Sequence, residues 1–327
     1  MSCVMVVGGA GYIGSHAVRA LQQAGRKVAV LDNLSTGHPE AVKDAALIRA
    51  DIRDTDAVYD ALMAHGVSAV MHFAADSRVG ESQADPEKYY DNNVSGTFSL
   101  LKALRRANVN KLVFSSTAAV YGDAQGLITE QYPKQPTNVY GRTKWMIEQM
   151  LADYDMAYGL KAISLRYFNA AGAHESGDIG EDHKPETHLI PLVLQAFGKQ
   201  KPLTVFGNDY PTKDGTCVRD YIHVADLAFA HVLALGSLEN GAGSNAYNLG
   251  NGKGFTVLEV IRTVERVTGR KVPYEVGARR PGDPPELVAD SSRIMRELNY
   301  APRFGNLEDI IRTAWRFFEA HPNGYGE

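Results

Sequence analysis

Cysteine is scarce in this chain of 327 residues, and long apolar runs are absent from its sequence. Cys3 and Cys217 are the only cysteines, and Cys3 starts a predicted buried strand, so we expect no disulfide framework and a reducing compartment. No run approaches the ~20 apolar residues of a membrane helix. The first residues lead directly into a short strand and do not have the pattern of a signal peptide. We therefore expect a soluble, cytoplasmic protein with no membrane partner.

An excess of charge of one sign is also lacking. The formal net charge of −4 argues against nucleic acid or an anionic membrane as a bulk partner. Hydrophobic residues make up 44% of the chain, which excludes a disordered protein. The length is sufficient for one large or two ordinary domains with a substantial core.

A recognisable metal-ligand spacing is a third absence. Histidines and carboxylates gather at His174-Glu175, Asp178 and Glu181-Asp182-His183. Their irregular spacing, on a segment predicted to be a glycine-containing loop, fits no ligand pattern. We therefore expect no metal site there.

The sequence does contain a glycine-rich turn between a predicted strand at 3–7 and a predicted helix at 15–24. Glycines at positions 8, 11 and 14 allow a tight turn and let backbone N–H groups approach a pyrophosphate at the start of the helix. A second predicted strand, 27–31, ends at Asp32, where a carboxylate can accept hydrogen bonds from an adenosine ribose. A carboxylate there would repel a 2′-phosphate, so the pattern favours NAD over NADP.

Strands and helices continue to alternate, which predicts an α/β fold with a Rossmann-type, doubly wound parallel sheet. Such sheets bind ligands at the carboxyl ends of their strands. Asp32, Asp51, residues 73–75 and residues 115–117 all follow predicted strands. The further predicted strands are 46–50, 69–73, 111–115, 160–166, 246–249 and 272–276, and the further helices are 55–65, 85–107, 138–158, 189–197, 224–235, 256–267, 291–298 and 307–320.

Tyr140 and Lys144 are four residues apart on the predicted helix 138–158, so they share one of its faces. A tyrosine ionises near pH ~10, and an ammonium group beside it favours the phenolate. Such a phenol can accept the proton of a sugar hydroxyl as hydride leaves the same carbon. Ser115-Ser116-Thr117 precedes this pair.

The second half has a different pattern. Residues 172–186 are polar, and residues 206–221 are predicted to be a long loop, which in a compact domain is usually functional. We expect a NAD-binding domain at 1–168, joined by segments near 222–250, and a smaller α/β substrate-binding lobe at 169–327.

With these segments in place, the chain resembles the extended short-chain dehydrogenase/reductase family and, within it, the UDP-hexose 4-epimerases. The loop motifs at 206 and 218 are more specific to that group than the glycine motif. The motifs are Val6 to His16, Leu31-Asp32-Asn33-Leu34, His72-Phe73-Ala74-Ala75, Tyr167-Phe168-Asn169, Phe206-Gly207-Asn208-Asp209-Tyr210-Pro211, Val218-Arg219-Asp220-Tyr221-Ile222-His223 and Arg280-Pro281-Gly282-Asp283.

The resemblance implies inversion of C4 of a UDP-hexose, as in UDP-glucose/UDP-galactose interconversion, through a transient 4-keto sugar. Tyr140 takes the C4 hydroxyl proton, bound NAD takes the hydride, Lys144 lowers the tyrosine pKa and Thr117 hydrogen-bonds the reacting oxygen. It further implies cofactor contacts at Gly8, Gly11, Tyr12, Ile13, Gly14, Asp32, Asn33, Leu34, Ser35, Thr36, Gly37, Asp51, Ile52, Phe73, Ala74, Ala75, Ser77, Asn92, Ser115, Tyr140, Lys144 and Phe168.

The implied substrate contacts lie mostly in the second half. Arg219 and Arg280 would hold the diphosphate, since guanidinium forks suit phosphate oxygens. The others are Asp283 for the uridine ribose, Thr204 and Phe206 for the uracil, and Asn169, His188 and Leu189 for the diphosphate and sugar. The resemblance also implies a homodimer that pairs helices 93–107 and 142–158.

Three positions depart from the best-known branch of that group. Ser77 stands where that branch has lysine, His188 where it has asparagine, and Leu287 where pocket width is set. The sugar pair therefore stays open among hexoses, N-acetylated hexoses and pentoses. A dehydratase would need an acid pair after Thr117, where Ala118 and Ala119 stand. A dehydrogenase that releases NADH and a non-catalytic NAD-sensing protein are further alternatives.

Overall fold

A seven-stranded parallel sheet forms the larger half of the computed structural model, which describes residues 2–198, 202–280 and 283–326. The strand order is β11-β7-β5-β4-β1-β2-β3, and every neighbouring pair is parallel. The predicted fold class is confirmed. The strands are β1 (Cys3–Val7), β2 (Lys27–Asp32), β3 (Ala46–Arg49), β4 (Val67–His72), β5 (Lys111–Thr117), β7 (Lys161–Tyr167) and β11 (Asn245–Leu249).

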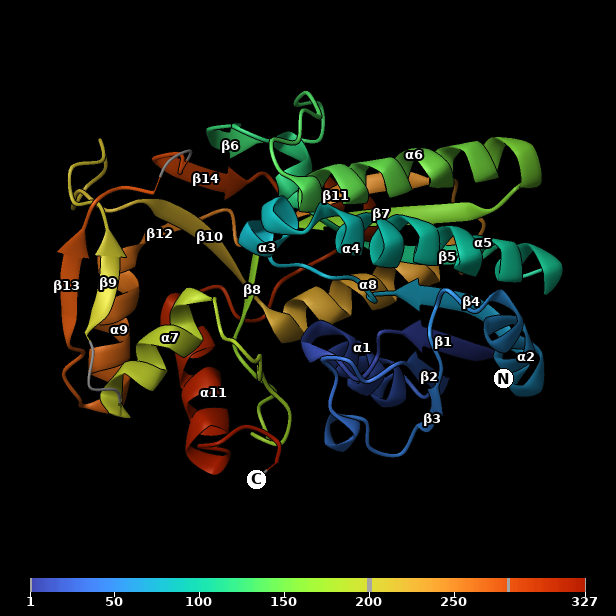
Figure 1. The fold of residues 1–327 in the computed structure, drawn as a ribbon, viewed down its shortest axis with the longest axis horizontal. Coiled ribbons are helices and arrows are strands. Elements are labelled where there is room, and N and C mark those ends of the chain that lie inside the picture. The colour runs from blue at the N-terminus through green and yellow to red at the C-terminus, as the bar shows by residue number, and fades with distance from the viewer. Residues whose placement is uncertain (1, 199–201, 281–282, 327) are drawn as a thin grey trace.

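Helices cover both faces of this sheet (Figure 1), because its central strands carry apolar side chains on both sides. One hydrophobic cluster joins the sheet to α1 (Tyr12–Gln23) and α8 (Val224–Glu239). A second cluster joins the opposite face to α2 (Thr55–His65), α5 (Gly96–Arg106) and α6 (Val139–Tyr158). The carboxyl ends of β1, β2, β4 and β5 thus open onto one rim between the two helical layers.

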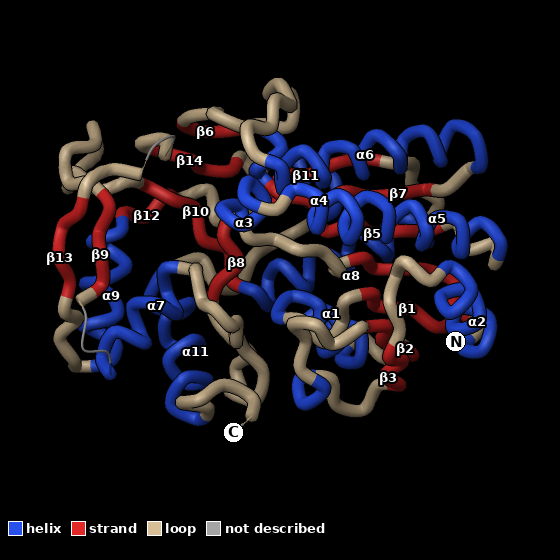
Figure 2. Tube along the Cα trace, in the orientation of Figure 1, coloured by secondary structure: helices blue, strands red, loops and turns tan. Residues whose placement is uncertain are grey.

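Two smaller sheets form the other side of the molecule (Figure 2). One has the order β12-β10-β14-β6, with β8 paired to β10, and the other pairs β13 with β9. The strands are β6 (Gly126–Ile128), β8 (Asn169–Ala171), β9 (Leu203–Phe206), β10 (Val218–His223), β12 (Gly254–Thr256), β13 (Tyr274–Gly277) and β14 (Glu286–Ala289), and the helices are α7 (Leu189–Gln195), α9 (Val257–Thr268) and α11 (Leu307–Ala320). The helix α10 (Ser292–Leu298) instead packs on β11 and α8 of the large sheet.

The prediction that residues 206–221 form a loop is wrong at both ends. Phe206 closes β9, and β10 begins at Val218 and pairs with three other strands. Asp220 in β10 is fully buried and accepts backbone N–H bonds from residues 251, 252 and 289 at 2.7–3.1 Å. In the sequence, a charged residue such as Asp220 makes a segment look like an exposed polar loop. The distant backbone N–H groups that allow its burial cannot be seen there, which explains the error.

The predicted helix 85–107 is also not a single regular helix. It consists of α4 (Pro86–Tyr89), a π-helical stretch η2 (Tyr90–Ser95) and α5, and α3 (Val79–Ala84) precedes it. π-turns inside helices often occur at functional sites. The shorter helical segments are η1 (Pro39–Ala41), η3 (Ala118–Tyr121) and η4 (Ala196–Gly198).

Parts of the second half return to the first. β11 is the edge strand of the large sheet, and α8 packs on α1. In the opposite direction, β6 leaves the first half to pair with β14. Both cysteines are buried and free, and within the described part of the chain no helix is long and apolar enough to cross a membrane.

Candidate active site

The glycine turn after β1 is tightly packed on one side and open on another. Gly8 has a φ of 76°, and a Cβ on it would lie 2.4 Å from the backbone nitrogen of Ala74. A Cβ on Gly14 would lie 2.2 Å from the carbonyl oxygen of Gly8, whereas one on Gly11 would meet nothing nearer than 3.5 Å. Packing therefore requires glycine at 8 and 14, while the open side at 11 leaves room for a ligand.

The start of α1 offers unpaired donors beside this turn. Gly11 is the N-cap and provides no side-chain cap, so the first N–H groups of the helix are available to an anion. Asp32 accepts hydrogen bonds from Ala10 N–H at 2.9 Å and Leu34 N–H at 2.8 Å, which braces the turn against the end of β2. This arrangement suits the pyrophosphate and adenosine ribose of NAD.

The other predicted cofactor residues of this rim follow neighbouring strands. Asn33 donates to Asp51 at 3.1 Å, and Arg53 holds the same carboxylate at 2.8 Å, which lowers the Asp51 pKa far below its usual range. Phe73 and Ala74 donate their N–H groups to the Val7 carbonyl. The loop at 35–37 packs on the glycine turn through Gly37, which lies beside Ala10. Ile13 packs against the cluster on the α1 and α8 face of the large sheet, and Ile52 belongs to the cluster on its opposite face. Ala75 follows Ala74 in the loop after β4, and Ser77 is exposed.

Tyr140, Lys144 and Thr117 meet at the carboxyl end of β5. α6 begins at Val139, where the Asn138 side chain caps Gly141 N–H at 2.7 Å. Tyr140 and Lys144, one helical turn apart in this first part of α6, are both buried. The ammonium nitrogen of Lys144 lies 5.9 Å from the centre of the Tyr140 ring and donates to the Ser115 carbonyl at 2.8 Å.

Burial dominates the ionisation of this pair. It raises the pKa of Tyr140 to about 12, against which a hydrogen bond with Thr117 acts. It also lowers the pKa of Lys144 to about 7, against which Glu148 acts. Desolvation penalises the charged forms of both groups, so burial sets the direction of both pKa shifts. That Lys144 lowers the tyrosine pKa stays a prediction. The Thr117 oxygen also accepts Ala119 N–H at 3.1 Å.

A buried polar network supports the pair and was not predicted from the sequence. Tyr140 N–H donates to the Ser82 hydroxyl, and Asn93 donates to Thr143 at 3.1 Å. The side-chain amide of Asn93 accepts a hydrogen bond from Asp76 N–H and donates one to the Asp76 carbonyl. These two bonds anchor the π-helical stretch to the loop after β4. Asn92, a predicted cofactor contact, donates to Asn93 at 3.3 Å.

Predicted nucleotide contacts group on the small sheets. Arg219 pairs with Asp283 at 3.2 Å, and the Arg280 guanidinium lies 4.0 Å from the centre of the Phe206 ring. Phe206 and Thr204 belong to β9, which pairs with β13. Residues 281 and 282, the middle of the predicted motif 280–283, lie outside the described residues.

Two predicted substrate positions lie closer to the large sheet. Asn169 opens β8 and donates to the Asp220 carbonyl at 2.8 Å, so the pairing of β8 with β10 brings it near Arg219. Phe168 precedes it, and both Phe168 and Leu287 pack against the buried cluster around Tyr121. Leu189 begins α7, and His188 caps that helix while its ring contacts two glutamates.

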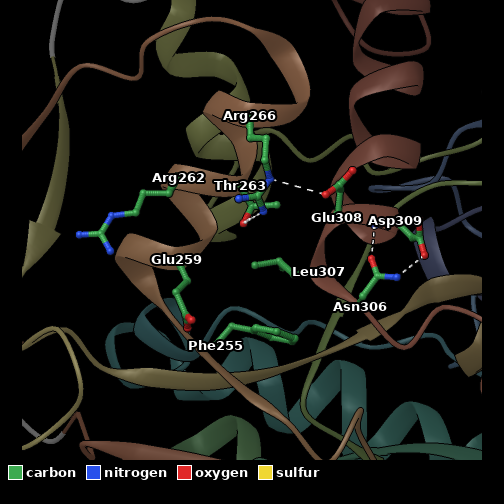
Figure 3. Close-up of a pocket in the computed structure, with 9 residues that line it drawn as sticks. All are labelled: Phe255, Glu259, Arg262, Thr263, Arg266, Asn306, Leu307, Glu308 and Asp309. Carbon is green, nitrogen blue, oxygen red and sulfur yellow. Dashed lines mark hydrogen bonds and ion pairs between the residues drawn. The ribbon is translucent and has the colours of Figure 1, made fainter.

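A surface pocket of about 560 Å³ lies between α9 and the start of α11 (Figure 3). Two of its charged side chains pair with each other, since Arg266 contacts Glu308 at 3.5 Å, and Asn306 caps α11 through Asp309 N–H. None of the predicted site residues lines this pocket. The chemistry of the molecule lies at the rim of the large sheet.

Comparison with known proteins agrees with this geometry. Residues 4–250 match the model of the NAD dependent epimerase/dehydratase family. The chain belongs to this family. The family match confirms the predicted resemblance and the predicted cofactor, NAD.

Three relatives of the family show how closely the chain matches it. A UDP-glucose 4-epimerase of Halalkalibacterium halodurans is 50% identical over 98% of this chain and 97% of its own. The crystal structure of UDP-glucose 4-epimerase from Brucella ovis in complex with NAD is 48% identical, with a TM-score of 0.94 over 97% and 98% of the two chains. That of Bifidobacterium longum UDP-glucose 4-epimerase with NAD+ and UDP is 39% identical, with a TM-score of 0.92 over 99% and 100%.

Proposed function

We propose that this protein is a NAD-dependent epimerase that inverts C4 of a UDP-hexose and interconverts UDP-glucose and UDP-galactose. The observation that carries the proposal is the buried Tyr140 in hydrogen-bond contact with Thr117, one helical turn from Lys144 and on the rim that holds the glycine turn. Relatives at about half identity over nearly the whole chain are UDP-glucose 4-epimerases, which supports the same reaction.

In this proposal Tyr140 is the proton acceptor and donor at the C4 hydroxyl, and Thr117 hydrogen-bonds the reacting oxygen. NAD, when bound, supplies hydride acceptance and return at C4, together with a positive charge near the phenol. That charge favours the phenolate against the burial that raises the Tyr140 pKa. Lys144 keeps its ammonium in place through the Ser115 carbonyl.

The nucleotide end of the substrate would be held by the small sheets. Arg219 and Arg280 would bind the diphosphate, with Asp283 on the uridine ribose and Thr204 and Phe206 on the uracil. The proposal is supported by the stacking of Arg280 on Phe206 and by the pairing of Arg219 with Asp283, which hold these side chains in place. Asn169, His188 and Leu189 would complete the floor.

We also propose a homodimer. The surfaces of α5 and α6 expose large apolar side chains: Phe98 is 46% exposed, Met146 40% and Met156 87%. A contact that pairs both helices with their copies would bury them as a four-helix bundle. Light scattering at micromolar concentration would show twice the chain mass, and a monomer there would contradict the proposal.

The domain division at 168 and the cytoplasmic location remain our proposals. The first is supported by a hydrophobic cluster composed only of residues of the smaller lobe, while segments near 222–250 join the core of the large sheet. The second is supported by two buried, free thiols.

The function is tested by incubating purified protein, without added NAD, with UDP-galactose and in a second tube with UDP-N-acetylglucosamine. Chromatography should show UDP-glucose in the first tube. The second tube decides whether N-acetylated sugars are accepted. Absence of any epimer from either substrate, in protein shown to contain NAD, would contradict the proposed function.

A further inference from the structure

Four potential metal ligands converge in the loop that precedes α7. They are Glu181, His183, Glu186 and His188, whose ligand atoms all lie within 4.8 Å of one another. His183 Nδ1 lies 3.3 Å from Glu181 Oε1 and 3.5 Å from Glu186 Oε2. His188 Nδ1 lies 2.7 Å from Glu181 Oε1 and 3.2 Å from Glu186 Oε1.

The segment that looked unsuited to a metal therefore does form a cluster, with different members. Of the predicted group, His174 contacts Ser176 and Asp178, and Glu175 pairs with Arg303. Asp182 instead accepts Tyr325 N–H at 3.0 Å. Only Glu181 and His183 face inward, where residues 186 and 188 join them.

Burial of the two carboxylates distinguishes this cluster from a solvated group of surface charges, although the side chains of His183 and His188 are 31% and 51% exposed. The side chains of Glu181 and Glu186 are only 6% and 3% exposed. Glu181 Oε1 and His183 Nδ1 are buried without a hydrogen-bond partner of acceptable geometry, although nitrogens lie within 3.3 Å of that oxygen. Two buried polar atoms are thus left without an aligned hydrogen bond, and a cation bound between them would satisfy both.

We propose that Glu181, His183, Glu186 and His188 form a structural zinc site. Two imidazole nitrogens and two carboxylate oxygens suit zinc, whereas magnesium and calcium prefer oxygen ligands throughout. Tetrahedral bonds of about 2.0–2.2 Å require ligand separations of about 3.3–3.5 Å, which most of the observed distances approach. The 2.7 Å separation of His188 Nδ1 and Glu181 Oε1 must lengthen, and separations near the 4.8 Å bound must shorten.

Charge also suits a divalent cation. The two carboxylates carry two negative charges, which one Zn²⁺ held by two neutral imidazoles would balance.

The expected role is to fix the loop that lies between the cofactor rim and α7. The His183 ring lies 6.2 Å from the ring of Tyr12, the first residue of α1, and His188 is the N-cap of α7. The Glu186 carboxylate is oriented by N–H groups of residues 187 and 188 at 2.6 and 2.8 Å. A metal would thus tie both ends of the segment 181–188 together.

The experiment is zinc titration of the chelator-treated full-length protein, with metal content measured after removal of unbound ions. We expect one Zn²⁺ per chain and a higher thermal midpoint with zinc than without it. Co²⁺ in place of zinc should give the intense visible absorption of a tetrahedral site. His183→Ala should lower zinc affinity at least about tenfold, as loss of a ligand or its support does.

His174→Ala is the matched control, since it removes an imidazole of the same loop that points away from the cluster. It should retain the zinc-dependent thermal shift and the cobalt spectrum. If His183→Ala fails to fold, Glu186→Gln provides the same test with an isosteric side chain. Substoichiometric zinc in the unaltered protein, or equal zinc affinity in the His183 and His174 variants, would overturn the proposal and leave a metal-free ion-pair cluster.

Discussion

The two sides of the proposed site differ in how they are held. On the rim of the large sheet, Tyr140, Lys144 and Thr117 are each at most 9% exposed, and their partners are backbone groups and buried polar side chains. On the small sheets, Arg280 is exposed and Phe206 is 36% exposed. The rigid side suits the reacting atoms, where small displacements are costly. The open side suits a nucleotide tether that must enter and leave.

The largest effect should come from removing the phenol oxygen at the rigid side. Tyr140→Phe should lower turnover by about 10²–10⁴-fold, the range for loss of a general base, while bound NAD is retained. Turnover is measured by chromatography and cofactor content by release on denaturation. Tyr132→Phe, an exposed tyrosine, is the control. Turnover of the Tyr140 variant within threefold of the unaltered protein would end this assignment.

A smaller effect is expected at the open side. Arg280→Leu should raise KM by roughly tenfold or more with little change in kcat, because a charged hydrogen bond worth about 1.5–3 kcal/mol is lost equally from ground and transition states. Arg279→Leu is the matched control, since its neighbouring guanidinium pairs with Asp209 instead. A fall in kcat with constant KM, measured by steady-state kinetics, would contradict the proposal that the small sheets only hold the nucleotide.

The glycine turn allows packing and ligand binding to be separated. Gly14→Ala should destabilise the protein by about 1–3 kcal/mol, since its Cβ would overlap the Gly8 carbonyl in a close-packed turn. Gly11→Ala should leave the stability of the NAD-free protein nearly unchanged but weaken the binding of NAD. Chemical denaturation and NAD titration of both variants give the comparison. Equal destabilisation by the two substitutions would show that the open side at 11 is also a packing surface.

The last predicted effect concerns pH. Burial lowers the pKa of Lys144 to about 7, so from pH 7 up to its ordinary value of ~10.4 the unfolded chain binds the extra proton, and stability relative to Lys144→Met rises with pH. The slope should approach about 1.4 kcal/mol per pH unit. Urea unfolding of both NAD-free proteins between pH 7.5 and 9.5 measures it. A constant stability difference across that range would show that Lys144 stays protonated when buried.

The sequence predicted those parts of the molecule in which short-range pattern and structure coincide. The glycine turn, Asp32 and the Tyr140/Lys144 spacing depend on residues within one βαβ unit or one helical turn. β10 was missed because Asp220 is satisfied by backbone from three distant residues. The cluster at 181–188 was missed because only folding brings Glu186 and His188 to Glu181. The spacing of Tyr140 and Lys144 predicts that they are neighbours, but it does not show how burial shifts their pKa values.

The central claim is that the C4 hydrogen of the sugar leaves and returns inside the site while Tyr140 handles only the hydroxyl proton. The most direct measurement is epimerisation of UDP-galactose labelled with deuterium at C4, mixed with unlabelled substrate in ordinary water. We predict UDP-glucose that keeps the full label at C4. Replacement of the label by solvent hydrogen would show that C4 exchanges its hydrogen as a proton, which contradicts the account.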